Sequence, residues 1–104
     1  MDVFNQYGRC TLAPIDMLQE AHGRNLCCIF LYELHGGWLY GYDIIIGNVI
    51  ANHRPLLGDT VYKSALNAKY AAKKAIFEEI KSSRKAKKIF EDFQITNYEQ
   101  LELF

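Results

Sequence analysis

The sequence LCCIFLYEL at residues 26–34, followed by HGG at 35–37 and WLYGYDIII at 38–46, decides the fold of this chain. The first segment is almost wholly apolar. The second alternates, which puts one set of side chains on a common strand face: Trp38, Tyr40, Tyr42, Ile44 and Ile46. Alternation with aromatic and β-branched residues is typical of strands, and a Gly-rich break between two such segments is typical of a turn. The sequence therefore predicts two antiparallel strands at 26–34 and 38–46.

The segments on either side of these strands extend the predicted sheet and add a helix. Gly47-Asn48 can reverse the chain into a third strand near Val49–His53, with Arg54–Leu57 as the alternative position. Before the first strand, Pro14 to His22 is predicted to form a short helix, because proline is favoured in a first helical turn and the following glycine provides a stop.

A helical period begins after Gly58-Asp59-Thr60, where Asp59 or Thr60 is a suitable N-cap. The apolar face of this helical segment comprises Ala68, Ala72, Ala75, Ile76, Ala86, Phe90 and Phe93. The opposite arc carries Lys69, Lys73, Lys74, Lys81, Arg84, Lys85 and Lys88. Ser82-Ser83 could split the segment into two helices, a long one to about Lys81 and a shorter one near Arg84–Phe93.

The predicted fold class is therefore α+β, with a short N-terminal helix, a three-stranded antiparallel sheet and a long basic C-terminal helix that could be kinked into two. One hundred and four residues suffice for one domain. We expect a single domain over residues 1–93 and a flexible tail over residues 94–104.

Charge is unevenly placed although it cancels over the whole chain. Residues 1–62 carry a balance of −3, residues 63–88 carry +7, and residues 89–104 carry −4. Lysines and arginines on one helix face can neutralise phosphates, and Tyr70 and Phe77, near the same arc, could stack on exposed bases. The alternative is that these lysines are simply solvated, which is the usual state of lysine.

The sequence shows no pattern typical of catalysis or of metal binding. His22, His35 and His53 lack ligand spacing, and a facing carboxylate pair is not indicated by Asp43 or Glu33. We expect a protein that is not an enzyme, with no cofactor, no metal and no small-molecule substrate. The three cysteines lack a C-x-x-C pair and no leader or membrane-spanning segment is evident, which favours a reduced, cytoplasmic setting. A homodimer remains open.

Two families share features with the body of the chain. Gly58-Asp59-Thr60 followed by VYKSALNAKYA at 61–71 resembles the strand-to-helix junction of HicB-type antitoxins, and GWLYGY at 37–42 is similar to their second strand. This likeness covers about fifty residues, but the helix is rich in lysine where HicB helices are acidic. AKYAAK at 68–73 is similar to the final helix of the double-stranded-RNA-binding fold, whose lysines grip phosphates. That family's loop signature is not visible at 35–37.

The last five residues, QLELF, resemble the pentapeptide with which bacterial and phage DNA-processing proteins dock on the β sliding clamp. Gln100, Leu101, Leu103 and Phe104 match, and Glu102 departs from the smaller polar residue of the family. Two adjacent apolar side chains at a chain end can enter one apolar pocket, and we expect reversible docking with a Kd on the order of micromolar. The alternative is that these residues pack on their own domain as a short strand.

These features lead to one hypothesis and an alternative. The first is an adaptor of bacterial, phage or mobile-element DNA metabolism, which contacts DNA or RNA through the basic helix face and the sliding clamp through the tail. The alternative is a HicB-like antitoxin or protein inhibitor that presents its sheet and helix to one protein partner.

Overall fold

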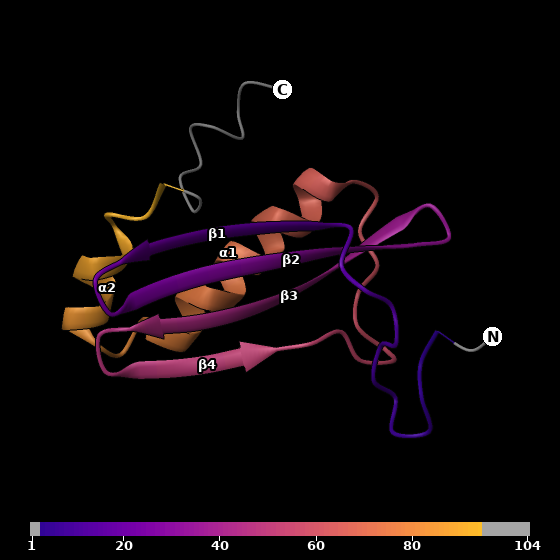
Figure 1. The fold of residues 1–104 in the computed structure, drawn as a ribbon, viewed down its shortest axis with the longest axis horizontal. Helices are drawn as coiled ribbons and strands as arrows, with labels where there is room; N and C mark the ends of the chain where they lie inside the picture. The colour runs from indigo at the N-terminus through magenta and orange to yellow at the C-terminus, as the bar shows by residue number, and fades with distance from the viewer. Residues whose placement is uncertain (1–2, 95–104) are drawn as a thin grey trace.

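Residues 3–94, which the computed structural model describes, form a four-stranded antiparallel sheet with two helices on one face (Figure 1). The strands are β1 (Asp16–His22), β2 (Asn25–Leu34), β3 (Gly37–Ile46) and β4 (Val49–His53), and the helices are α1 (Ala65–Ile80) and α2 (Arg84–Phe90). Strands that follow one another in the chain are neighbours in the sheet, in the order β1-β2-β3-β4. The sheet is therefore a meander built from local connections.

Two-residue turns join these strands. Between β2 and β3, His35 and Gly36 have φ values of 51° and 81°. Positive φ at both central positions is the geometry of a type I′ turn, whose twist matches that of the strands it connects. The following residue, Gly37, starts β3 and pairs with Leu34.

The predicted N-terminal helix is wrong, because most of that segment is β1. Asp16–His22 pairs along its length with Leu31–Asn25 of β2, with Leu18 opposite Ile29. β2 is apolar on both faces and its backbone needs hydrogen-bond partners on both edges. That requirement outweighs the helix propensity of Met17, Leu18 and Gln19, which is a weak preference in so short a segment. The sheet consequently has four strands where three were predicted.

The predicted long C-terminal helix is two helices, separated at Lys81–Ser83. α1 starts later than expected: Ser64 is its N-cap and accepts from the Asn67 N–H at 3.0 Å, so neither Asp59 nor Thr60 has that role. Ser83 caps α2 by accepting from the Ala86 N–H at 3.2 Å. Its hydroxyl also donates to Asn48 Oδ1 at 2.9 Å, which ties the start of α2 to the β3–β4 turn.

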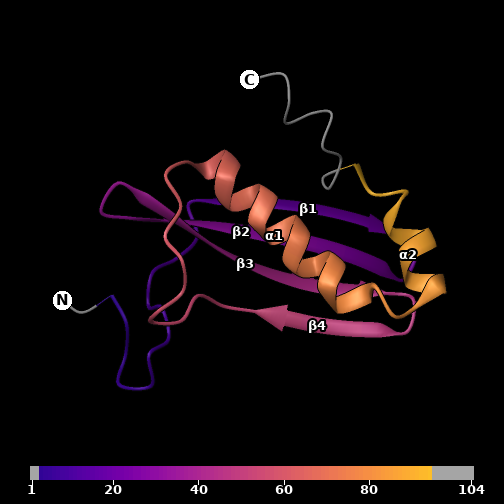
Figure 2. The same cartoon turned by 180° about the vertical axis from the view of Figure 1, so that it is seen from behind.

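The core lies between the sheet and the two helices. α1 runs diagonally across the sheet and α2 lies near one end of it (Figure 2). The buried side chains of this layer are Cys27, Ile29 and Leu31 of β2, Tyr42, Ile44 and Ile46 of β3, Ala68, Ala72, Ile76 and Ile80 of α1, and Ala86, Phe90 and Phe93 at the C-terminal end. Cys28, Tyr32 and Leu39 are also buried, on the other face of the sheet. Trp38 and Tyr40 pack against this cluster, which confirms the interpretation of the aromatic strand face as core.

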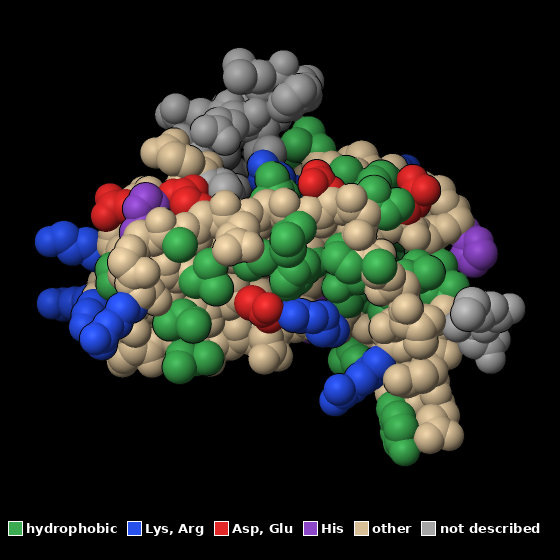
Figure 3. All heavy atoms as spheres, viewed as in Figure 1, with side chains coloured by type: hydrophobic (Ala, Val, Ile, Leu, Met, Phe, Trp, Pro, Cys, Tyr) green, Lys and Arg blue, Asp and Glu red, His purple; other side chains and the backbone are tan. Residues whose placement is uncertain are grey.

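The opposite face of the sheet has no helix over it (Figure 1). We call this surface the open face, and define it by Met17, Ala21, Leu26, Phe30, Ile45 and Ile50, which the strand alternation places together. Figure 3 looks onto this face and shows hydrophobic side chains spread over the strands. Cys28 lies on this side while Cys27 lies in the core, as expected for neighbours in one strand.

Candidate nucleic-acid interface

The outer surface of α1 follows from the way its inner surface is buried. Ala68, Ala72, Ile76 and Ile80 recur every four residues and are fully buried against the sheet. Small alanines at the start of the helix let its backbone approach the strands closely. The opposite side of α1 therefore faces solvent (Figure 2).

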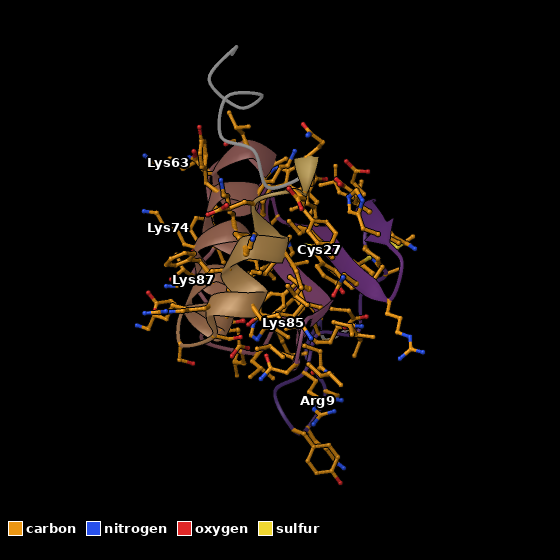
Figure 4. The ribbon with its side chains drawn as sticks, turned by 90° about the vertical axis from the view of Figure 1, so that its left-hand side faces the viewer. Arg9, Cys27, Lys63, Lys74, Lys85 and Lys87 are labelled. Carbon is orange, nitrogen blue, oxygen red and sulfur yellow. The ribbon has the colours of Figure 1, made fainter. Side chains whose placement is uncertain are left out.

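A stripe of basic and aromatic residues follows this outer side, and we call it the α1 stripe. It comprises Tyr70, Lys74, Phe77 and Lys81, in which residues seven positions apart lie on nearly the same line of the helix, together with Lys63 just before the helix begins. Lys63, Lys74, Phe77 and Lys81 are exposed and Tyr70 is half-buried. Lys63 and Lys74 project from the same side of the helical layer as Lys87 of α2 (Figure 4).

Two of the predicted contact residues lie away from this stripe. Lys69 and Lys73 precede Tyr70 and Lys74 by one position, which places them about 100° further round the helix toward the sheet. Both are half-buried. Burial lowers the pKa of Lys73 from its ordinary value, because the charged ammonium is partly removed from water.

The basic surface continues into α2. Arg84, Lys85 and Lys88 are all exposed, and their spacing places them on one arc of this short helix. Lys81 and Arg84 flank the turn between the helices, so the two groups of charges adjoin along the chain. The structure thus exposes five of the seven predicted residues: Lys74, Lys81, Arg84, Lys85 and Lys88.

Sequence reasoning omitted Lys63 and Lys87 from this surface. Lys63 precedes α1 and was outside the predicted contact set, and because Ser64 is extended, the helical period does not place Lys63. Lys87 is half-buried and points outward with Lys63 and Lys74 (Figure 4). Its position depends on the path of α2, which the sequence did not specify.

The two acidic residues of α1 offset little of this charge. Glu79 accepts a hydrogen bond from the Tyr42 hydroxyl at 2.8 Å, so it is directed to the sheet. Burial, followed by this hydrogen bond, raises the pKa of Tyr42 above its ordinary value. Glu78 forms an exposed ion pair with Lys81, with Nζ and Oε2 2.5 Å apart. Such an exposed pair is weak.

An exposed aromatic ring lies among these charges. Phe77 is 43% exposed, and it lines a shallow hollow with Lys73, Lys74 and Glu78. A flat apolar ring beside ammonium groups can stack on a base while a lysine contacts the adjoining phosphate. The hollow is thus suited to a single-stranded segment.

A second cluster lies at the end of β4, where the sequence suggested only an isolated histidine. His53 Nε2 lies 2.9 Å from Asp59 Oδ2, and the same oxygen accepts from the Leu56 N–H at 3.0 Å. The His53 ring also packs beside Tyr40, with centroids 5.5 Å apart. The carboxylate therefore closes the 56–59 turn and orients the imidazole. The spacing of six residues between His53 and Asp59 carries no general signal, so only the fold shows this pair.

The other polar predictions have structural explanations. Asp43 pairs with Arg54 through two contacts of 2.8 and 2.9 Å, so its carboxylate is occupied. His22 and His35 are exposed at the end of β1 and in the β2–β3 turn. Within residues 3–94, no group of three or more His, Cys, Asp or Glu side chains is placed to hold a metal ion.

The predicted clamp-binding residues Gln100, Leu101, Leu103 and Phe104 lie outside the residues that the structure describes. The described chain ends at Gln94, whose N–H donates to Glu20 Oε1 at 2.8 Å beside β1. Over the described part of the chain, neither helix has the length and apolar character needed to cross a membrane. No protein-family model, curated protein or solved structure matches this chain.

Proposed function

We propose that this protein is a small non-enzymatic adaptor of bacterial, phage or mobile-element DNA metabolism. It binds DNA or RNA through the α1 stripe and the exposed face of α2, and it docks on the β sliding clamp through Gln100, Leu101, Leu103 and Phe104. The observation that carries the nucleic-acid part is that five lysines and arginines of α1, α2 and the turn between them are exposed: Lys74, Lys81, Arg84, Lys85 and Lys88.

The binding is electrostatic and indifferent to sequence. Ammonium and guanidinium groups on an exposed helix contact phosphates, and the release of condensed counterions favours the complex. About five such contacts predict a slope of log K against log salt of roughly −3.5 for a single strand and −4.5 for a duplex. Phe77 adds stacking on bases that are not paired, which favours single strands.

The clamp part of the proposal rests on the resemblance of the last five residues to the clamp-binding motif. Leu103 and Phe104 supply apolar area, while the Gln100 amide can both donate and accept at a pocket rim. Docking of this kind raises the local concentration of the domain on DNA without a new contact to it. A weak nucleic-acid surface then suffices for function.

Fluorescence anisotropy of a labelled oligonucleotide tests the nucleic-acid part. Lys74→Glu and Lys88→Glu should each weaken binding at least fivefold at low salt, because each replaces a phosphate contact with a repulsive charge. Arg9→Glu is the matched control, since Arg9 is also exposed but lies apart from Lys74 and outside the helical layer (Figure 4). Equal losses in all three variants would show that only total charge matters and would contradict the assigned surface.

A labelled peptide of residues 94–104, titrated with a purified bacterial clamp, tests the docking part. We expect saturable binding in the micromolar range, and loss of binding when Leu103 and Phe104 are both replaced by alanine. No saturation at several hundred micromolar clamp would contradict docking, and it would leave the nucleic-acid part unaffected.

A further inference from the structure

The open face is organised as rows of side chains that run across the strands. The strand register places Ala21 opposite Leu26, Leu26 opposite Ile45, and Ile45 opposite Ile50, which gives one apolar row across all four strands. Two residues further along, Gln19, Cys28, Asp43 and Asn52 form a polar row. Beyond it, Met17 lies opposite Phe30. Apolar groups therefore flank a narrow polar centre.

Several of these side chains are far more exposed than their type favours. Ile50 is 77% exposed, Met17 is 55% exposed and Ile45 is 40% exposed. Single exposed apolar residues are ordinary, but Ile45 and Ile50 are paired in one row, and Met17 lies on the same sheet surface beyond the polar row. Exposed apolar rows beside polar groups are typical of a surface on which something else packs.

The charges on the open face cancel within each molecule. Arg54 binds Asp43 through both guanidinium nitrogens and lies over the Phe30 ring, with Cζ 4.5 Å from the ring centroid. The surface thus has no excess charge that would select an acidic or basic partner. It contrasts with the helical side of the molecule, where lysines and arginines dominate.

We propose that the open face is a homodimer interface, with a second copy of this chain as its occupant. A two-fold axis parallel to the strands, between β2 and β3, places Ala21 against Ile50 of the second copy, and Leu26 against Ile45. The same axis places the Gln19 amide against that of Asn52, and amides pair with each other because each both donates and accepts. An isologous interface requires a surface that is complementary to itself in this way.

The extent of the open face indicates a weak dimer. Three rows spaced two residues apart, over four strands about 4.8 Å apart, cover on the order of 400 Å² if the surface is treated as flat. The unevenness of the side chains adds to this area. Two copies would bury roughly 1,000 Å² in total, which is the lower end of the range for specific interfaces. We therefore expect association that depends on concentration in the micromolar range. In such a dimer the two helical layers face outward on opposite sides, so nucleic-acid binding would remain possible on both.

Sedimentation velocity of the full chain without nucleic acid, from about 5 to 500 µM, tests the inference. The sedimentation coefficient of the wild type should rise with concentration. Ile50→Glu and Met17→Lys, on opposite edge strands, should each stay monomeric over the whole range. Phe77→Glu is the control, because it places the same charge on an exposed apolar residue of α1. It should associate as the wild type does, and circular dichroism should show that all variants are folded.

Three results would overturn the inference. The first is a wild type that stays monomeric at 500 µM, even if that monomer binds a different protein. The second is unchanged association of folded Ile50→Glu and Met17→Lys. The third is loss of association in Phe77→Glu alone, which would assign the contact to the helical layer. Because no nucleic acid is present, these outcomes are independent of the function proposed above.

Discussion

At the scale of single residues, Asp59 shows how one carboxylate can define the end of a sheet. Its Oδ2 atom accepts from the Leu56 backbone and contacts His53 Nε2, so it fixes the loop between β4 and α1. The sequence favoured Asp59 as a helix cap, and it does stabilise a chain reversal, but six residues before the first residue of α1. A short polar side chain suits both roles, so composition does not distinguish them.

Replacing Asp59 with alanine should lower the free energy of unfolding by about 1 kcal/mol, because it leaves the Leu56 N–H and His53 without their partner. Urea denaturation of Asp59→Ala measures this loss. Asp92→Ala removes an equal charge from an exposed position after α2 and should change stability far less. Equal stability of the two variants would contradict the role assigned to Asp59.

The buried thiol of Cys27 predicts alkaline sensitivity. Burial, and then the neighbouring Cys28, raise the pKa of Cys27 from 9.0 to about 12. The folded state therefore holds this proton more tightly than the unfolded chain. The stability it contributes is full below about pH 9 and is lost as the pH rises toward 12. The raised pKa values of the half-buried Tyr40 and the buried Tyr42 act in the same direction.

Urea unfolding between pH 7 and pH 10.5 should show a falling free energy of unfolding. Cys27→Ala should be less stable at pH 7 but should lose less with rising pH than the wild type. Cys10→Ala, at a half-buried position outside the core, is the comparison. A wild type and a Cys27→Ala variant with the same pH dependence would show that the thiol does not contribute.

At the scale of elements, the two serines between the helices offer a matched pair. Ser83 caps α2 and bonds Asn48, whereas Ser82 is exposed in the turn. Ser83→Ala should cost about 1 kcal/mol of stability, as is typical of a lost N-cap, and Ser82→Ala should cost much less. Chemical denaturation of both variants measures the difference. Comparable losses in the two variants would contradict the role of Ser83 as the N-cap that starts α2.

The exposed Phe77 ring on α1 predicts a preference for single-stranded over duplex nucleic acid, which charge alone does not give. Phe77→Ala should weaken binding to a single strand about tenfold, because stacking on one base contributes roughly 1–3 kcal/mol. Binding to a duplex should change little, since its bases are not available to the ring. Parallel anisotropy titrations with the two oligonucleotides test this. An equal loss for both would assign Phe77 a purely structural role.

The elements differ in how far the sequence determined them. β2 and β3 follow from alternation and from their glycine-containing turn, and the two helices follow from a 3.6-residue period and the break at Ser82-Ser83. β1 does not, because its residues favour a helix locally and become a strand only by pairing with β2. Helical angles also separate Lys74 from the core correctly. Lys73 was grouped with the basic arc, but it lies about 100° round the helix from Lys74, toward the sheet, and is half-buried.

At the scale of the whole molecule, the sheet divides two unlike surfaces. Lysines and arginines extend over the helical side, while neutral apolar side chains cover much of the open face (Figures 3 and 4). The open face could not be predicted, because β1, assigned as a helix, contributes one of its edges. The chemistry of the helical side could be predicted, since it depends on residues of two helices with clear periods.

The central claim is that exposed cations of the α1 stripe and α2 contact phosphates, and the salt dependence of nucleic-acid binding tests it most directly. For a single-stranded oligonucleotide, log K against log salt should have a slope of roughly −3.5 for the wild type, and the Lys74→Glu/Lys88→Glu variant should be shallower by about 1 to 2. A wild-type slope near zero, or a slope that this variant leaves unchanged, would contradict the account.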